Sequence, residues 1–212
     1  KYDDVVNDQR KAVFEQRAEF MVAADLSDII KEMREDTIED LVTRYLPPKA
    51  YAEQWDTHRL HEEILRLFGL DLPIAEWAKE EGVAESEVHQ RITDLVARKM
   101  ADKAATWGPE IMRDVEKSLL LQVLDQVWKD HLLGLDHLRH GIGLRAYGQK
   151  DPLNEYKGEA FEMFNAMLDE LDDRVTLLLA HMELQITAPD GAQLRFGPPP
   201  SQNVREGFED PA

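Results

Sequence analysis

The sequence predicts an all-α protein, and three observations support this fold class. Apolar residues recur at steps of three and four, which is the spacing of one face of a helix. The alternation typical of half-buried strands is rare. The 11 glycines and 10 prolines gather at a few positions, where they mark the ends of elements. We expect a long antiparallel helical hairpin, another long helix, a small helical lobe inserted between them, and a disordered C-terminal tail.

Two helices are predicted before the first proline pair. Residues 2–24 place apolar side chains such as Phe14 and Met21 at helical spacing. Ser27 is the expected N-cap of the next helix, because its hydroxyl can accept from the free amides of a helix start. Pro47-Pro48 ends this second helix, since proline disfavours helical geometry in the residue before it.

The elements predicted between residues 50 and 106 are short. Residues 50–68 suggest a pair of helices, and Pro73 opens a further helix over residues 74–81. Glu85 or Ser86 begins another, whose apolar residues share one face. These elements form the small helical lobe.

The most regular pattern follows the break at Trp107-Gly108-Pro109. It predicts a helix of about 30 residues, roughly 45 Å long. Two neighbouring apolar stripes give it a wide buried face, so it should pack against more than one neighbour. The first stripe is Met112, Val115, Leu119, Val123 and Val127, and the second is Leu120, Leu124, Trp128, Leu135 and Leu138.

A glycine-rich loop over residues 141–150 separates this helix from a second long one. Gly141 is the expected C-cap, Asp151 the expected N-cap, and Pro152 suits the first helical position. From Leu153 to Met182 the steps of three and four persist for about four heptads. A short loop between two long helices predicts an antiparallel hairpin.

The loop is the candidate contact site. Exposed apolar and aromatic side chains beside cationic ones suit a surface that binds another chain, and glycines let a partner approach the backbone. The alternative is that these side chains fold back onto a neighbouring domain. The predicted contact residues are Ile142, Leu144, Arg145, Tyr147 and Gln149, and the residues that shape the loop are Gly141, Gly143, Gly148, Asp151 and Pro152.

Signals for enzymatic chemistry are weak. We find no P-loop, no G-x-S-x-G and no H-E-x-x-H, and the chain has no cysteine. Gly141-x-Gly143-x-x-Ala146 matches a relaxed dinucleotide fingerprint, but it follows a helix where that motif requires a strand. We therefore predict no catalytic residue and no cofactor in this chain.

Histidines and acidic pairs give two further candidates. Asp136 and His140, with His131 and His137 nearby, could hold zinc if a third ligand joined them, but a carboxylate–imidazole pair on a polar face is favoured. We therefore predict no metal. In a chain this acidic, the acidic pairs at 80–81 and 172–173 are expected to be solvated. Neither pair forms a ready acid–base dyad, because adjacent helix residues do not face each other. The net charge of -18 argues against nucleic-acid binding.

Several stretches carry a family resemblance. The longest are LQVLDQVWKDHL at residues 121–132, LRHGI at 138–142 and LRAYGQKDP at 144–152. Upstream, YDDVVNDQR at 2–10 and LPIAEW at 72–77 add to it. In this order, over about residues 1–185, the chain resembles the SecA family of bacterial preprotein translocase ATPases.

The resemblance implies four segments. Residues 1–25 would be the end of a long scaffold helix and residues 26–108 a helical wing domain. Residues 109–184 would form a two-helix finger with the scaffold continuation, and residues 185–212 a flexible linker. The motor domains that bind ATP and Mg would precede Lys1, and the family's zinc-binding tail would follow the linker.

The resemblance also implies a function. The parent would be an ATP-driven motor that pushes secretory preproteins through the SecY channel, in the cytoplasm at the inner face of the plasma membrane. This piece would transmit motor motion, and its tip, with Tyr147 as the aromatic, would contact polypeptide and channel. Further partners would be the motor domains and, as an option, a second copy in a homodimer. The alternative is a non-enzymatic helical adaptor docked on one fixed protein, with a metal-dependent helical enzyme as a more distant one.

Overall fold

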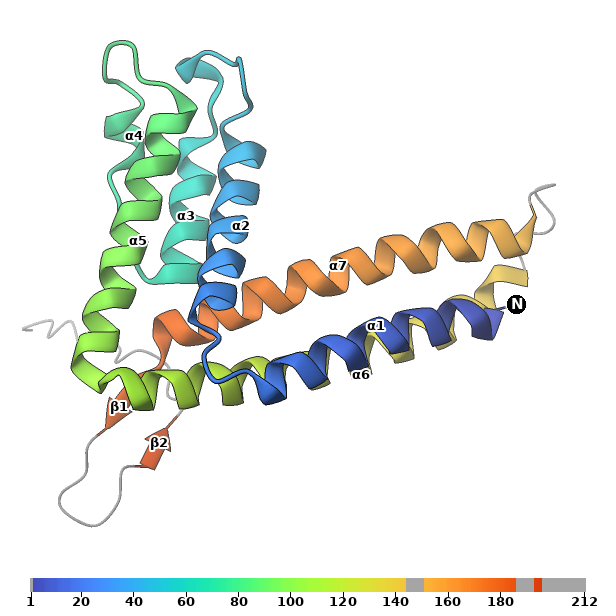
Figure 1. Ribbon diagram of the computed structural model, residues 1–212. Helices are drawn as coiled ribbons and strands as arrows, with labels where there is room; N and C mark the ends of the chain where they lie inside the picture. The colour runs from blue at the N-terminus through green and yellow to red at the C-terminus, as the bar shows by residue number, and fades with distance from the viewer. Residues whose placement is uncertain (1, 144–150, 186–192, 196–212) are drawn as a thin grey trace, which may run out of the picture. The chain divides into compact units, whose positions relative to one another are not determined.

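The computed structural model describes residues 2–143, 151–185 and 193–195, and it divides the chain into two compact units, 1–180 and 181–212. The all-α prediction is confirmed, because the first unit is built from helices (Figure 1). The helices are α1 (Tyr2–Val22), α2 (Ser27–Tyr45), the 3-10 turn η1 (Ala52–Gln54), α3 (Thr57–Phe68), α4 (Ile74–Trp77), α5 (Glu85–Trp107), α6 (Pro109–Ile142) and α7 (Pro152–His181).

The helix ends differ from the predictions at several points. Ser27 is not the N-cap of α2: Leu26 holds that position, and the Asp25 carboxylate accepts from the Ser27 N–H at 2.8 Å. Gly141 is not a C-cap, because α6 continues to Ile142 and ends at Gly143, whose φ is -60°. The predicted break before α6 is confirmed, and Gly108 adopts the positive φ of 86° that favours glycine.

The helices α2, α3, α4 and α5 form the predicted helical lobe (Figure 1). α5 is longer than the sequence suggested and α4 is a single turn. Their core is apolar, and each fully buried aliphatic side chain contributes about 1.5–3 kcal/mol. Its most deeply buried members are Leu46, Leu60, Ile64, Phe68, Val88 and Ile92, and Leu177 and Ala180 of α7 pack against the same cluster.

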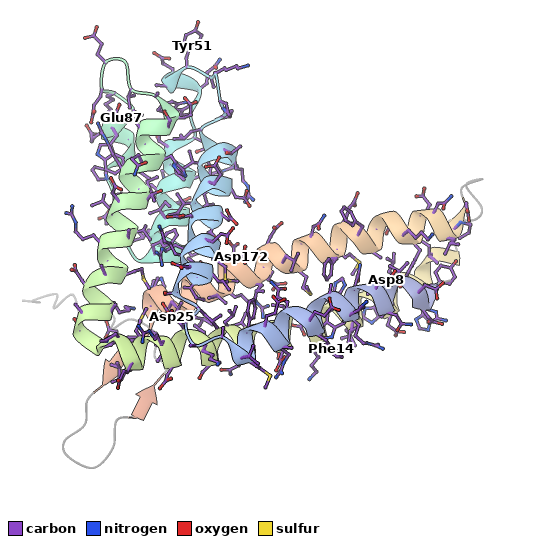
Figure 2. The ribbon with its side chains drawn as sticks, viewed as in Figure 1. Asp8, Phe14, Asp25, Tyr51, Glu87 and Asp172 are labelled. Atoms are coloured by element: carbon purple, nitrogen blue, oxygen red, sulfur yellow. The ribbon has the colours of Figure 1, made fainter. Side chains whose placement is uncertain are left out.

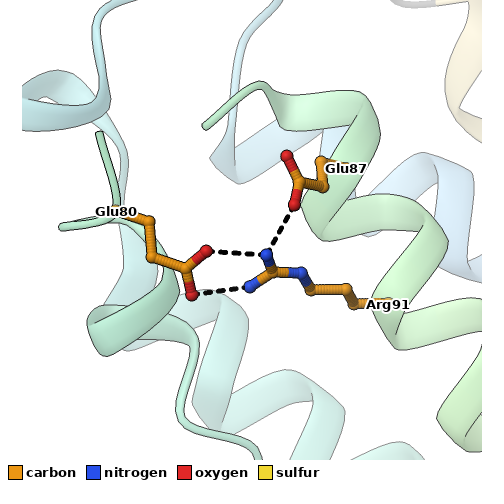
Figure 3. Close-up of polar contacts among 3 residues, drawn as sticks. All are labelled: Glu80, Glu87 and Arg91. Atoms are coloured by element: carbon orange, nitrogen blue, oxygen red, sulfur yellow. Dashed lines mark hydrogen bonds and ion pairs between the residues drawn. The ribbon is translucent and has the colours of Figure 1, made fainter. Parts of the chain in front are cut away.

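The side chain of Arg91 in α5 links the turn after α4 to α5 through hydrogen-bonded ion pairs (Figure 3). Its two terminal nitrogens lie 2.7 and 2.6 Å from the two oxygens of Glu80, and Glu87 approaches to 2.5 Å. The guanidinium also stands 5.5 Å from the centre of the Trp77 ring. Hydrogen bonding to Arg91 lowers the pKa of Glu80. The predicted solvated pair at 80–81 therefore includes one carboxylate with a structural partner.

The predicted pair of long helices is present. α6 and α7 run antiparallel, and α1 lies along α6 (Figure 1). The backbones of α1 and α6 approach each other more closely than those of α6 and α7, which meet through long side chains. The hairpin is therefore one part of a three-helix body. Both predicted stripes of α6 are buried, except that Leu138 is half-buried. In α1 the pattern was less reliable, because Phe14 and Met21 are exposed and Phe20 is buried instead.

The second unit contains a short antiparallel ribbon that the sequence did not predict. Strand β1 (Glu183–Gln185) pairs with β2 (Gln193–Arg195), with Leu184 opposite Leu194. Three residues are too few to show alternation, so the pattern carried no strand signal. Most of the predicted tail lies outside the described residues. In the described part of the chain, no helix has the length and hydropathy needed to cross a bilayer.

Candidate functional site

The predicted loop residues fall into two groups. Gly141, Ile142 and Gly143 end α6, and Asp151 and Pro152 begin α7, where the Asp151 carboxylate accepts from the Leu153 N–H at 3.1 Å. The other predicted site residues lie outside the described part of the chain: Leu144, Arg145, Tyr147, Gly148 and Gln149. The structure thus defines the base from which the loop leaves.

Ile142 is not exposed, which corrects the expectation from the sequence. It is 3 % exposed and packs in a cluster with Leu135 of α6 and with Tyr156 and Ala160 of α7. The physical reason is that α6 continues through Gly141, so Ile142 stays in the stripe of Leu135, two helical turns earlier. That spacing of seven was visible in the sequence and could have placed Ile142 correctly.

The cluster beneath the loop joins all three long helices. The ring of Tyr2 in α1 meets Tyr156 edge to face, with the centroids 4.8 Å apart. Arg139 of α6 bonds to Asp3 of α1 at 2.8 Å. Burial is the main cause that raises the pKa of Tyr156. The two stems of the loop are thus held by packing, and an aromatic pair adds about 0.5–1.5 kcal/mol beyond its buried area.

The histidines of α6 do not converge. The Nδ1 of His140 lies 2.7 Å from the backbone carbonyl of Asp136 one turn earlier and 3.6 Å from its carboxylate, so the carboxylate–imidazole pair of the favoured interpretation is a long contact. His131 is buried and faces Gln9 of α1. Within the described ranges, no group of three or more His, Asp or Glu side chains is arranged to hold a metal ion.

A charged cluster on α6 holds the connection between α1 and α2, and sequence reasoning missed it. The Nζ of Lys117 donates to the carbonyls of Met21 and Ala23, at 2.6 and 2.9 Å. Arg113 lies 3.0 Å from Asp25, which Figure 2 labels beside this connection. A signal for this contact was present in the sequence, because the last turn of α1 carries no basic residue. The free carbonyls at that helix end therefore favour a cation from another helix.

We expect Lys117→Met to lower the free energy of unfolding by about 1–2 kcal/mol, because hydrogen bonds from a charged donor and the favourable helix-end charge are both lost. Urea denaturation of the chain measures this change. Lys129→Met, at an exposed position of the same helix, is the matched control and should change the free energy by less than about 0.5 kcal/mol. Equal effects of the two substitutions would show that Lys117 does not stabilise the end of α1.

Acidic side chains gather between α2 and α7, around a pocket of about 230 Å³. Its lining includes Asp36 and Asp40 from α2 and Asp169, Asp172 and Asp173 from α7. Burial, followed by the charge of Asp36, raises the pKa of Asp172 to about 7. Asp172 is half-buried, and Figure 2 labels it where α2 meets α7. The expectation that this acidic pair is solvated is therefore wrong for Asp172.

Comparisons with known proteins agree with this architecture. The family described as SecA Wing and Scaffold domain matches residues 1–183. The chain is 59% identical over 184 residues to the protein translocase subunit SecA of Acidiphilium cryptum, covering 87% of this chain and 20% of that protein. The SecA of Caulobacter vibrioides is 58% identical over 190 residues, covering 90% and 21%. The chain thus spans about a fifth of the length of these relatives.

Proposed function

Because the chain belongs to the SecA wing and scaffold domain family, we propose that it is part of a translocase that moves secretory preproteins through the SecY channel. ATP and Mg would bind in motor domains elsewhere in the protein, which would work in the cytoplasm at the inner face of the plasma membrane. A second copy in a homodimer is a further option. This segment transmits motion from the motor domains to the loop between α6 and α7.

The observation that carries this role is the packed base of the loop. Ile142 and Leu135 of α6 contact Tyr156 and Ala160 of α7, and Tyr2 of α1 closes the cluster. Side chains packed at the density of a protein interior deform little, so a displacement of the long helices reaches the loop. Ile142 serves in this base and not as a contact residue.

The loop residues have the chemistry that a varied polypeptide requires. Tyr147 offers a large apolar ring with one polar end, so it binds many side chains without a specific hydrogen-bond pattern. Leu144 adds apolar area, and Arg145 and Gln149 can donate to the backbone carbonyls of an extended chain. We propose these four residues as the contact site for preprotein and channel.

We expect Tyr147→Ala in the intact translocase to reduce preprotein transport about tenfold while basal ATP hydrolysis is retained, because loss of a central aromatic contact costs about 1–2 kcal/mol or more. Transport into membrane vesicles and phosphate release measure the two activities. Tyr51→Ala is the matched control, since Tyr51 is a tyrosine of the helical lobe that is 77% exposed. Transport that is unchanged by Tyr147→Ala would remove the special role of the tip.

A further inference from the structure

One polar bridge crosses the apolar contact between the three long helices. Gln9 of α1 lies between His131 of α6 and Ala160 of α7. The Nε2 of Gln9 donates to the Ala160 carbonyl at 2.9 Å, and its Oε1 lies 2.8 Å from the Nε2 of His131. A single side chain of α1 is therefore bonded to both helices of the hairpin.

The partners fix the direction of both hydrogen bonds. A backbone carbonyl can only accept, so the amide nitrogen of Gln9 must face Ala160 and its oxygen must face His131. The Nε2 of His131 is then the donor. The imidazole also lies near two aromatic rings, with centroids 5.5 Å from Trp128 and 5.8 Å from Phe164. Burial lowers the pKa of His131, which favours the neutral ring.

The apolar contacts beside the bridge do not fix the axial position of α1 by themselves. The ion pairs Arg17–Asp125 and Asp3–Arg139 also join α1 to α6, but they are exposed, and exposed ion pairs contribute little. Val5 and Val6 of α1 and Met163 of α7 belong to the apolar packing beside the bridge. Apolar attraction is non-directional, and a similar area is buried if one helix slides along another. A slide of one turn, about 5.4 Å, would break both bonds of Gln9 and leave the buried imidazole of His131 without its acceptor. Single buried polar residues are known to specify register between packed helices in this way.

We propose that the Gln9–His131 bridge fixes the axial register of α1 against α6 and α7, so that α1 and the hairpin move as one body during transport. Gln9 and His131 are then positioning residues for the transport reaction. The inference rests on the proposed function for its consequence in transport. The register itself can be measured without any transport.

The test compares two substitutions at one position in the intact translocase. His131→Gln keeps an amide donor near the place of the imidazole Nε2, whereas His131→Leu removes the donor and retains an apolar side chain of similar bulk. We expect His131→Leu to fold with reduced stability, because the Oε1 of Gln9 loses its donor, although this half-buried side chain can still reach solvent. Its transport per ATP hydrolysed should fall about fivefold or more, as coupling between sites corresponds to about 5–150-fold. His131→Gln should stay close to the parent in both.

A second readout follows the register directly. Spin labels at exposed Asp8 of α1 and Lys129 of α6 report the distance between the two helices. The distribution of distances between the two labels should broaden in His131→Leu and stay narrow in His131→Gln. Unchanged transport per ATP together with a narrow distribution in a folded His131→Leu protein would overturn the proposal. If that variant does not fold, Gln9→Met removes the same bonds from a half-buried position and is judged by the same results. Failure of both variants to fold would also overturn it, because the bridge would then serve folding.

The Tyr147→Ala experiment separates this proposal from the proposed function. If Tyr147→Ala blocks transport while His131→Leu leaves it intact, the register proposal alone fails. If Tyr147→Ala leaves transport unchanged, the tip has no special role. If the spin-label distance distribution still broadens in His131→Leu, the proposal that the Gln9–His131 bridge fixes the register stands.

Discussion

Tyr156→Ala is expected to lower the free energy of unfolding by about 3–5 kcal/mol, as the truncation of a large buried aromatic does. Tyr156 is 1% exposed and packs with Leu135, Ile142 and Ala160 beneath the loop. Its removal would also leave Tyr2 without its edge-to-face partner. Urea denaturation of the chain, followed by circular dichroism, measures the change.

Phe161→Ala is the matched control for this substitution. Phe161 lies in the same helix five residues later and is 62% exposed. Its truncation should change the free energy of unfolding by no more than about 0.5 kcal/mol, as is usual at the surface. A loss at Phe161 as large as that at Tyr156 would contradict the packing described for the base of the loop.

Asp172→Asn is expected to stabilise the protein, by about 1–3 kcal/mol at pH 8. The pKa of Asp172 rises from the ordinary 3.8 to about 7 in the folded state, so the folded protein binds a proton more tightly than the unfolded chain. Stability from this group is present below about pH 4 and is lost as the pH rises through 7. The pKa difference alone corresponds to about 4 kcal/mol, and screening by solvent reduces it.

The pH dependence makes this prediction specific. Denaturation curves at pH 4 and pH 8 should show a larger gain for Asp172→Asn at pH 8, because asparagine carries no charge at either pH. Asp114→Asn, at an exposed position on α6, should stay within about 0.5 kcal/mol of the parent at both values. A gain at Asp172 that is equal at pH 4 and pH 8 would show that burial and Asp36 do not raise its pKa.

Long-period patterns explain why so much of the fold could be predicted. The stripes of α6 repeat over many turns, so both could be placed on its buried faces before any neighbour was known. Gly108-Pro109 combines a left-handed position with a favoured first helical residue, which made this break predictable. Ser27 shows the limit of such local rules, because Asp25 supplies the capping oxygen instead.

The features that escaped prediction depend on which helix faces meet. Asp172 flanks a buried stripe of α7, and its pKa is raised first by burial and then by the charge of Asp36, which α2 brings to the same place together with Asp40. Lys117 and Met21 are far apart in the sequence, and neither carries a local motif. His131 was weighed with its neighbours on α6 as a metal ligand, whereas its partner lies on α1. Such pairs become visible only when the packing of the helices is known.

The central claim is that the loop between α6 and α7 contacts the polypeptide in transit, and a photoreactive side chain at position 147 of the intact translocase tests it most directly. During active transport we expect crosslinks to the preprotein whose positions advance along its sequence with time. Crosslinks to one fixed protein, the same with and without transport, would contradict the claim and identify the segment as an adaptor.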